Sequence, residues 1–131
     1  MSYDINIYQG AFLRRALSEN LGDWTGAPDI DNGTRVRFGE ALRAQGFRET
    51  PHEPEFLTFA AAKGFSVSHD FVRDDDEILA TASVFSNSLT FSIPMSPRSG
   101  KSIEQCLNIT RELVAFGELC SYDPQTGELS N

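Results

Sequence analysis

The sequence predicts an α+β fold in which two to three helices pack on one face of a mostly antiparallel β-sheet. Several stretches alternate apolar and polar residues, as strands with one buried face do, whereas others repeat apolar residues every three or four positions, as helices do. The 131 residues suffice for one hydrophobic core, and ten phenylalanines supply large apolar surfaces to fill it. We therefore expect a single domain over residues 1–131.

The N-terminal part of the chain is predicted to form a strand, a helix and a long loop. Residues 3–8 alternate apolar and polar side chains and so indicate a strand. Residues 11–21 carry the apolar stripe of a helix, and Gly22 follows where a helix can end in a left-handed turn. The loop over residues 22–33 is rich in turn formers and acids, and it holds the only tryptophan, Trp24.

A second helix is predicted over residues 34–45. Asp31 or Thr34 can cap its first turn, and Gly46 is placed to end it. Beyond this helix two prolines interrupt the pattern, and residues 55–64 can form a short strand or a turn or two of helix. Of these two alternatives we expect an extended piece over residues 56–59.

The middle of the chain is predicted to form three strands. Residues 65–70, 78–85 and 89–93 are rich in strand-forming residues. The charged run over residues 72–77 indicates a turn between the first two strands, and residues 86–88 indicate a hairpin between the last two. Such alternation suits an antiparallel sheet that is covered on one face.

The last part of the chain is predicted to form a long helix and a strand. Ser102, with a glutamine three residues later, matches a capping box, and an apolar stripe continues from there to Gly117. We expect this helix to lie across the apolar face of the sheet. A strand over residues 119–122 and a turn at Asp123 and Pro124 should then tie the C-terminal end into the sheet.

The charge balance disfavours several classes of partner. The chain has 11 basic and 19 acidic residues, which gives a formal net charge of −8. Nucleic-acid binders need a basic surface to displace counterions, so we expect no nucleic-acid partner, whereas a basic protein partner is favoured. No apolar run is long enough to span a bilayer, and the first residues lack the features of a signal peptide. We therefore expect a cytoplasmic protein that binds no membrane.

The sequence contains no strong catalytic pattern. His69 and Asp70 could act as a base and its orienting group, but neighbours in a strand point to opposite faces. Cys120 follows the end of a predicted helix, whose dipole opposes formation of a thiolate. We assign no catalytic residue. A small enzyme or ligand-binding protein that uses His69, Asp70 and the surface around Tyr122 and Asp123 remains the alternative.

No metal or cofactor site is expected. The stretch that begins at Asp29 and Asp31 is similar to the start of a calcium loop, but Gly33 falls at the fifth position, where the loop needs a ligand. Cys106 and Cys120 lack the spacing of metal ligands, so we expect two reduced, buried thiols. The two aspartates are expected in a capped loop that leads into the second helix.

The candidate contact residues for a protein partner are acidic or aromatic. The simplest interpretation of the acidic run at residues 74–77 is a solvated turn, and the alternative is an acidic knob that docks into a basic cleft and speeds association. A tryptophan in a polar loop can anchor an interface or fold back on its own core. The candidate set comprises Trp24, Asp29, Asp31, Asp74, Asp75, Asp76 and Glu77.

Three stretches of the chain resemble a known group of proteins. MSYDINIY at the start, FSIP in the middle and CSYDPQTGEL at the end resemble small uncharacterised bacterial cytosolic proteins, some of which look like immunity proteins of polymorphic toxin systems. The resemblance implies a binder without catalysis, encoded beside a toxin and blocking the active site of that toxin.

The leading hypothesis is therefore a non-enzymatic protein-binding domain, in its most concrete form an immunity protein that neutralises a cognate, basic toxin domain. The small enzyme or ligand-binding protein described above is the alternative from another class. A third hypothesis is a self-associating subunit, such as a homodimer, in which sheet edges or phenylalanine-rich surfaces pair between copies.

Overall fold

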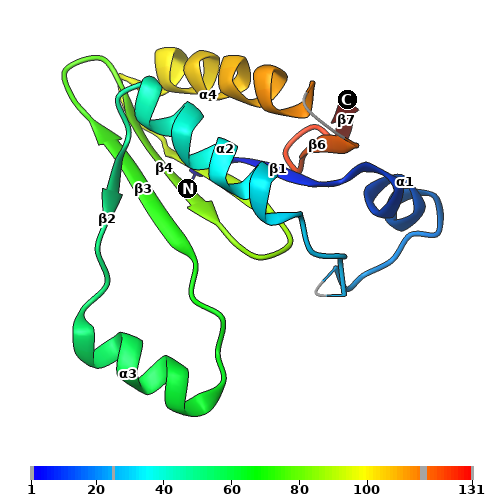
Figure 1. Cartoon of the computed structure of the whole chain (residues 1–131). Coiled ribbons are helices and arrows are strands. Elements are labelled where there is room, and N and C mark those ends of the chain that lie inside the picture. The colour runs from blue at the N-terminus through cyan, green and yellow to red at the C-terminus, as the bar shows by residue number, and fades with distance from the viewer. Residues whose placement is uncertain (1, 25, 116–117, 131) are drawn as a thin grey trace.

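A seven-stranded sheet runs through the molecule in the order β2-β3-β4-β5-β1-β6-β7, and all neighbouring strands are antiparallel (Figure 1). The computed structural model describes residues 2–24, 26–115 and 118–130. Within them the elements are β1 (Ser2–Gln9), α1 (Gly10–Ser18), α2 (Asn32–Ala44), β2 (Arg48–Thr50), α3 (Pro54–Lys63), β3 (His69–Asp74), β4 (Leu79–Val84), β5 (Leu89–Pro94), α4 (Ser99–Val114), β6 (Leu119–Asp123) and β7 (Glu128–Ser130). The predicted α+β class is confirmed, with four helices in these residues where two to three were expected.

The α2 and α4 helices cover one face of the sheet and enclose the main core (Figure 1). Phe38 of α2, Ile109 of α4 and Phe91 of β5 each have an exposed fraction of 1% or less. Along β5 the buried residues alternate with partly exposed ones, so one face of the strand is apolar and the other is polar. As predicted, α4 lies across the apolar face of the sheet, where it contacts β1, β4, β5 and β6.

A smaller apolar cluster lies on the other face of β1. Ile7 belongs to the main core, whereas the next residue, Tyr8, packs against Phe12 of α1 and the ring of Trp24. Successive side chains of a strand point to opposite faces, which explains how neighbouring residues reach different clusters. The helix α1 and the loop after it therefore cover part of the second face.

Both early helices end in left-handed turns. At the end of α2, Gly46 has a φ of 86°, and the Phe47 N–H donates to the Leu42 carbonyl at 3.0 Å, as predicted for that glycine. The prediction for α1 was wrong, because Asn20, with a φ of 55°, takes the left-handed position and not Gly22. Asparagine tolerates this conformation better than most residues, so it can end a helix where glycine is expected.

The short extended piece expected at residues 56–59 is also wrong, because α3 includes these residues. Pro54 lies in the first turn of α3, where its fixed φ favours a helix. Proline lacks a backbone N–H, but an N–H in the first turn would have no hydrogen-bond acceptor within the helix. Gly64 ends the helix with a φ of 72°. The proline that suggested an interruption is therefore at the start of a helix, and the glycine is at its end.

The third strand and the last helix begin at other residues than predicted. The strand β3 starts at His69 and runs to Asp74, so part of the charged run belongs to the strand and not to the turn. The helix α4 starts at Ser99, and Ser102 lies inside it. The Ser102 hydroxyl accepts from the Leu79 N–H at 2.9 Å and donates to the Arg98 carbonyl at 2.8 Å. The capping-box prediction was therefore wrong, and this serine joins α4 to β4.

The C-terminal end is tied into the sheet, as predicted. The strand β6 pairs with both β1 and β7, and the Asp123 carboxylate accepts from the backbone N–H groups of Gln125 and Thr126 in the turn between β6 and β7. The Tyr3 hydroxyl donates to the same carboxylate, which raises the pKa of Tyr3 to about 12. Gly117, the expected end of the helical stripe, lies outside the described residues. Among the helices that are described, none is long and apolar enough to cross a membrane.

Candidate functional site

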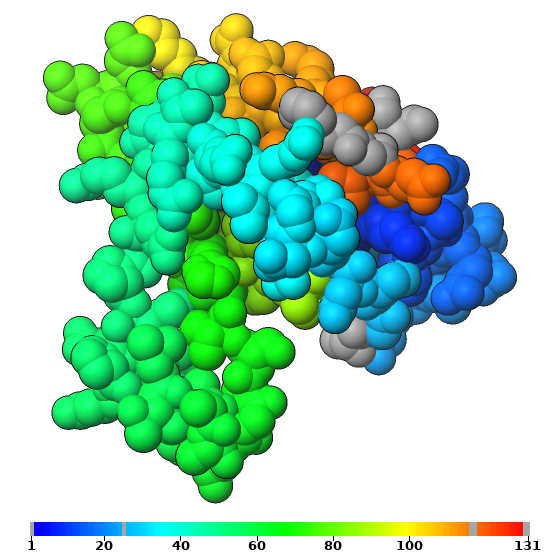
Figure 2. Space-filling model, in the orientation of Figure 1, coloured from blue at the N-terminus to red at the C-terminus, as the bar shows by residue number. Residues whose placement is uncertain are grey.

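An arm of the chain extends away from the sheet between β2 and β3. We define the α3 arm as residues 51–68, with α3 at its tip. The arm leaves the end of β2, carries α3 well below the body and returns to the start of β3 (Figure 1). Within the described residues, α3 packs extensively against no other helix or strand. Figure 2 shows the arm as a lobe of its own, separate from the bulk of the protein.

The α3 arm exposes large apolar side chains. Phe56, Phe59 and Phe65 are 47%, 53% and 61% exposed, and Leu57 is 44% exposed, whereas only Ala60 of the helix is buried. The apolar residues of α3 lie on all sides of the helix and not on one stripe. A helix that is apolar all round is normally buried. The arm therefore has the composition of a core element and the exposure of a surface element.

The base of the arm is fastened by polar contacts. The His52 Nε2 donates to the Ser68 carbonyl at 2.6 Å, which joins the outgoing and returning segments. The Ser68 hydroxyl donates to Asp70 at 2.9 Å, and the same carboxylate lies 3.9 Å from the His52 Nε2. These contacts fix where the arm leaves the body but bury none of its apolar tip.

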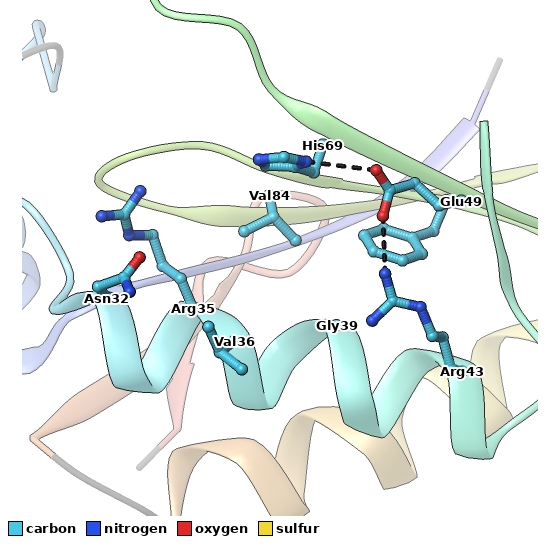
Figure 3. Close-up of a pocket in the computed structure, with 9 residues that line it drawn as sticks. Asn32, Arg35, Val36, Gly39, Arg43, Glu49, His69 and Val84 are labelled. Atoms are coloured by element: carbon cyan, nitrogen blue, oxygen red, sulfur yellow. Dashed lines mark hydrogen bonds and ion pairs between the residues drawn. The ribbon is translucent and has the colours of Figure 1, made fainter. Parts of the chain in front are cut away.

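A groove lies between α2 and the edge of the sheet, at the end where the arm begins (Figure 3). Buried Phe71 and Val84 form its apolar floor, and Val36 of α2, which is exposed, adds an apolar side chain to the lining. Gly39 permits this shape, because a Cβ there would lie 3.6 Å from the Phe71 ring and 3.2 Å from the Arg43 guanidinium. The groove has a volume of about 200 Å³ and is lined by Asn32, Arg35, Val36, Gly39, Arg43, Glu49, His69, Phe71 and Val84.

The rim of the groove is mainly basic, although the protein as a whole is acidic. Glu49 of β2 bridges two basic groups, since its carboxylate lies 2.7 Å from Arg43 Nη2 and 3.4 Å from His69 Nδ1 (Figure 3). The Arg43 guanidinium also lies 5.3 Å from the centre of the Phe71 ring. On the opposite side of the groove, Arg35 donates through Nε to the Ile30 carbonyl at 3.0 Å. Two arginines, one histidine and one carboxylate thus line the groove.

The predicted contact residues in the loop before α2 take mainly structural positions. The Trp24 ring packs 5.4 Å from Tyr8 and 5.2 Å from Tyr122, and its Nε1 donates to the Leu21 carbonyl at 3.0 Å. This half-buried tryptophan folds back on its own core. Asp31 caps α2 by accepting from the Thr34 N–H and hydroxyl, which lowers the pKa of Asp31. Asp29 is exposed.

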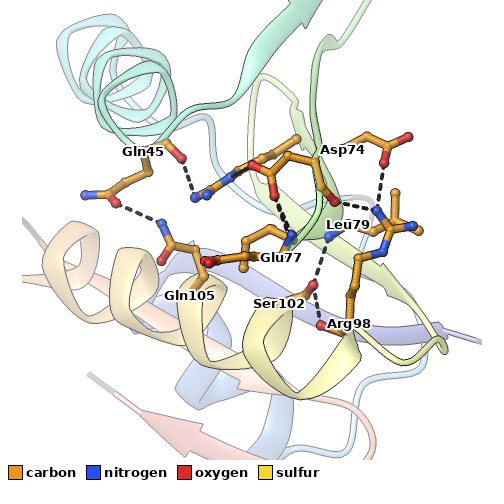
Figure 4. A network of polar contacts seen from close by, with 10 residues as sticks. Gln45, Asp74, Glu77, Leu79, Arg98, Ser102 and Gln105 are labelled. Atoms are coloured by element: carbon orange, nitrogen blue, oxygen red, sulfur yellow. Dashed lines mark hydrogen bonds and ion pairs between the residues drawn. The ribbon is translucent and has the colours of Figure 1, made fainter.

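The acidic run comprises the last residue of β3 and the turn that follows it, and half of the run holds this turn together (Figure 4). Asp74 forms an ion pair with Arg98 at 2.9 Å. Asp75 accepts from Arg73 at 2.7 Å and from the N–H groups of the two residues before β4, which lowers the pKa of Asp75 to about 2. The side chains of Asp76 and Glu77 are exposed.

The predicted contact residues do not form one surface. The acidic turn precedes β4, whereas the loop with Asp29 lies near the turn that follows β4, because the Ile30 N–H donates to the Ser86 carbonyl at 2.9 Å. The two acidic groups therefore lie at opposite ends of β4.

The residues of the catalytic alternative are also separated. His69 contacts Glu49 on the α2 face of the sheet, and Asp70 contacts His52 on the opposite face. Tyr122 and Asp123 belong to β6, and β4, β5 and β1 lie between β3 and β6 in the sheet. No single site joins these residues.

The cysteines and acidic residues show no metal centre within the described part of the chain, since no group of three His, Cys, Asp or Glu side chains is placed to hold an ion. Cys106 and Cys120 are free and buried, as predicted. Burial raises the pKa of Cys106 to about 12, so its thiol stays protonated at neutral pH.

The α3 arm and the groove were missed by sequence reasoning, although signals for both were present. Pro54 and Gly64 enclose an apolar, alanine-rich stretch that has the composition of a helix. His69 and Phe71, two residues apart in a strand, had to share one face of the sheet. Their pairing with α2 depends on contacts distant in sequence, which local patterns do not contain.

Comparison with known proteins found no match for this chain: no family model matches, and no curated protein or solved structure is significantly similar. The feature that departs most from an ordinary folded surface is the exposed α3 arm.

Proposed function

We propose that the protein is a non-enzymatic protein-binding domain and that the α3 arm is its contact surface. The observation that carries this proposal is a ten-residue helix, apolar on all sides, that projects from the body with its phenylalanines half exposed. Burying the exposed half of each ring against a partner would stabilise a complex by about 2 kcal/mol. Such a surface costs free energy in water unless something covers it.

The shape of the arm suits insertion into a groove. In helix-in-groove recognition, a partner surrounds the apolar side chains of a short helix. The arm makes α3 accessible to such a partner because the sheet and the other helices lie away from it (Figure 1). Glu53 and Glu55 add negative charge at the N-terminal end of α3, so an apolar groove with a basic rim is the matching surface.

Toxin neutralisation is the most concrete form of this function. The partner would be a basic toxin domain in the same cytoplasm, and the arm would block its active site. Support comes from the resemblance of the chain's ends and FSIP strand to immunity-like proteins and from the net charge of −8. The exposed Asp76 and Glu77 would steer such a partner from a distance, and this steering would weaken with salt.

Affinity capture from the cells that make the protein tests the proposal. We compare the wild-type chain with the double variant Phe56→Ser/Phe59→Ser and with Met95→Ser, whose apolar side chain is 58% exposed at the far end of β5. The wild type and Met95→Ser should retain one stoichiometric partner that the double variant loses. Retention by the double variant would remove the arm as the contact surface, and the absence of any foreign partner would remove the proposed function.

A small-ligand site is the second candidate function, and the groove favours it. His69 is held by Glu49 beside Arg43, an arrangement that can bind an anion and transfer a proton. The His69 side chain is 67% exposed, so bulk water competes for every such contact, and this favours the first proposal. A pH-dependent activity that disappears in His69→Ala and persists in Phe56→Ser/Phe59→Ser would reverse that preference.

A further inference from the structure

The exposed apolar side chains gather at one end of the molecule. Of the eight large apolar residues exposed in the described part of the chain, four belong to the α3 arm, Val36 lines the groove and Phe85 follows the groove residue Val84. His69, where the arm rejoins the sheet, pairs with Val84 in the register of β3 and β4. The groove, the β4–β5 turn and the base of the arm are therefore neighbours.

The arm and the groove are complementary in charge and in polarity. The groove combines an apolar floor with Arg35, Arg43 and His69 on its rim, against one acidic residue. The α3 helix combines apolar sides with Glu53 and Glu55 at its start, against one lysine at its end. Each surface thus has the character that its partner surface would need.

We propose that the groove between α2 and β3 receives the α3 arm of a second copy of this chain, so that two copies exchange arms in a symmetric dimer. The proposal rests on the proposed function, because the same arm is the contact surface. The arm holds its own helix away from its own groove (Figures 1 and 2), so each chain presents both halves of the contact unused. In reciprocal exchange, each arm occupies the groove of the other chain. No arm or groove is then left to bind a third copy, so the assembly stops at two copies.

The arm carries more apolar surface than the groove alone can enclose. Three half-exposed phenylalanines and a leucine present on the order of 400 Å² of apolar surface on each arm. The groove, about 200 Å³ in volume, has room for one or two of these side chains, so the rest of the arm would lie on the surface around it. The dimer would also cover the surface that a foreign partner binds, so a partner would compete with self-association.

Charge reversal with mixing tests the arm exchange. Sedimentation equilibrium at low salt measures the mass of the wild type, of the arm variant Glu53→Lys/Glu55→Lys and of the groove variant Arg35→Glu/Arg43→Glu. The wild type should dimerise, and each variant alone should dimerise at least tenfold more weakly, because like charges then meet in both contacts. An equimolar mixture should recover the dimer, since the lysine arm meets the glutamate groove and the wild-type arm meets the arginine groove.

Apolar variants decide the question where charge reversal disturbs folding. Phe59→Ser on the arm and Val36→Ser in the groove change exposed side chains, and each should lower self-association at least tenfold, whereas Met95→Ser should not. Circular dichroism confirms that each variant is folded.

Three outcomes overturn the arm exchange. A wild type that stays monomeric at every concentration removes the dimer, and a dimer insensitive to all variants places its interface elsewhere. A dimer lost in the arm variants but retained in Val36→Ser and in the groove variant removes the groove as receptor. If the chain is monomeric and binds a foreign partner through Phe59, the proposed function is supported and the arm exchange is contradicted. If the chain forms the exchanged dimer and binds no foreign partner, the arm exchange is supported and the proposed function is contradicted.

Discussion

The sheet body and the α3 arm use the same kind of residue in opposite ways. In the body, Phe38 and Phe91 are completely buried between the sheet and its two covering helices. In the arm, Phe56 and Phe59 belong to a helix that is more apolar in composition than α2 or α4, but about half of each side chain faces water. A helix needs a second layer to bury its apolar surface, and the body supplies that layer for α2 and α4 but not for α3. Under the proposed function, another molecule supplies the missing layer.

The largest expected effect is the removal of an aromatic ring from the body. Phe91→Ala should lower the free energy of unfolding by about 3–5 kcal/mol, because it leaves a cavity beneath α2 and α4. Denaturation in urea measures the loss. Phe85→Ala, at an exposed position just beyond β4, is the matched control and should cost less than about 1 kcal/mol. Similar costs for both substitutions would contradict the distinction between buried and exposed phenylalanines.

A second test removes one polar contact that joins the layers of the body. Ser102→Ala should lower the free energy of unfolding by about 1–3 kcal/mol, because the Leu79 N–H at the start of β4 loses its acceptor. Ser99→Ala removes a hydroxyl that only donates within its own turn, to the Ser96 carbonyl, so it should cost less. Equal unfolding midpoints for Ser102→Ala and the wild type would show that this contact contributes nothing.

A third test concerns pH and the turn at the far end of the body. The pKa of Asp75 is about 2 in the folded chain, below its usual value, so its ionised form stabilises the fold. That contribution is complete above the usual carboxyl pKa and is lost as the pH falls from about 4 to 2. The unfolding midpoint of Asp75→Asn should therefore lie below that of the wild type at pH 7 and approach it at pH 2. Asp76→Asn, which leaves these contacts in place, is the control, and a gap that persists at pH 2 would contradict the mechanism.

The smallest expected effect on folding lies in the arm. Phe59→Ser should change the free energy of unfolding by less than about 0.5 kcal/mol when measured where the chain is monomeric, because its side chain packs on no core. Hydrogen exchange should show the α3 amides exchanging far faster than those of β5. A loss of several kcal/mol would mean that the arm belongs to the core of its own chain.

The body was more predictable from sequence than the arm, for a physical reason. The alternation in β5 and the apolar stripe of α4 reflect burial within the same chain, so each pattern predicts both an element and its buried face. The α3 helix has no such pattern, because its apolar residues lie on all sides and nothing in the chain covers them. Without a periodic apolar face, Pro54 indicates an interruption and not the start of a helix.

The candidate site was least predictable where it depends on distant contacts. The acidic run suggested a contact surface, but Asp74 and Asp75 are engaged by Arg98 and Arg73. Arg98 lies more than twenty residues away in sequence and reaches the turn only after the sheet has formed. Similarly, Glu49 and His69 meet because β2 and β3 pair, which neither segment indicates alone.

The polar contacts of His52 and Ser68 at the base of the arm have an evolutionary consequence. Because His52 and Ser68 meet across the neck, the chain leaves the body and returns to it at nearly one point. The residues between them can then be exchanged, lengthened or shortened without moving any strand of the sheet. Under the proposed function, changes confined to the tip of the arm would alter the binding specificity, while the sheet and the helices that cover it keep their structure.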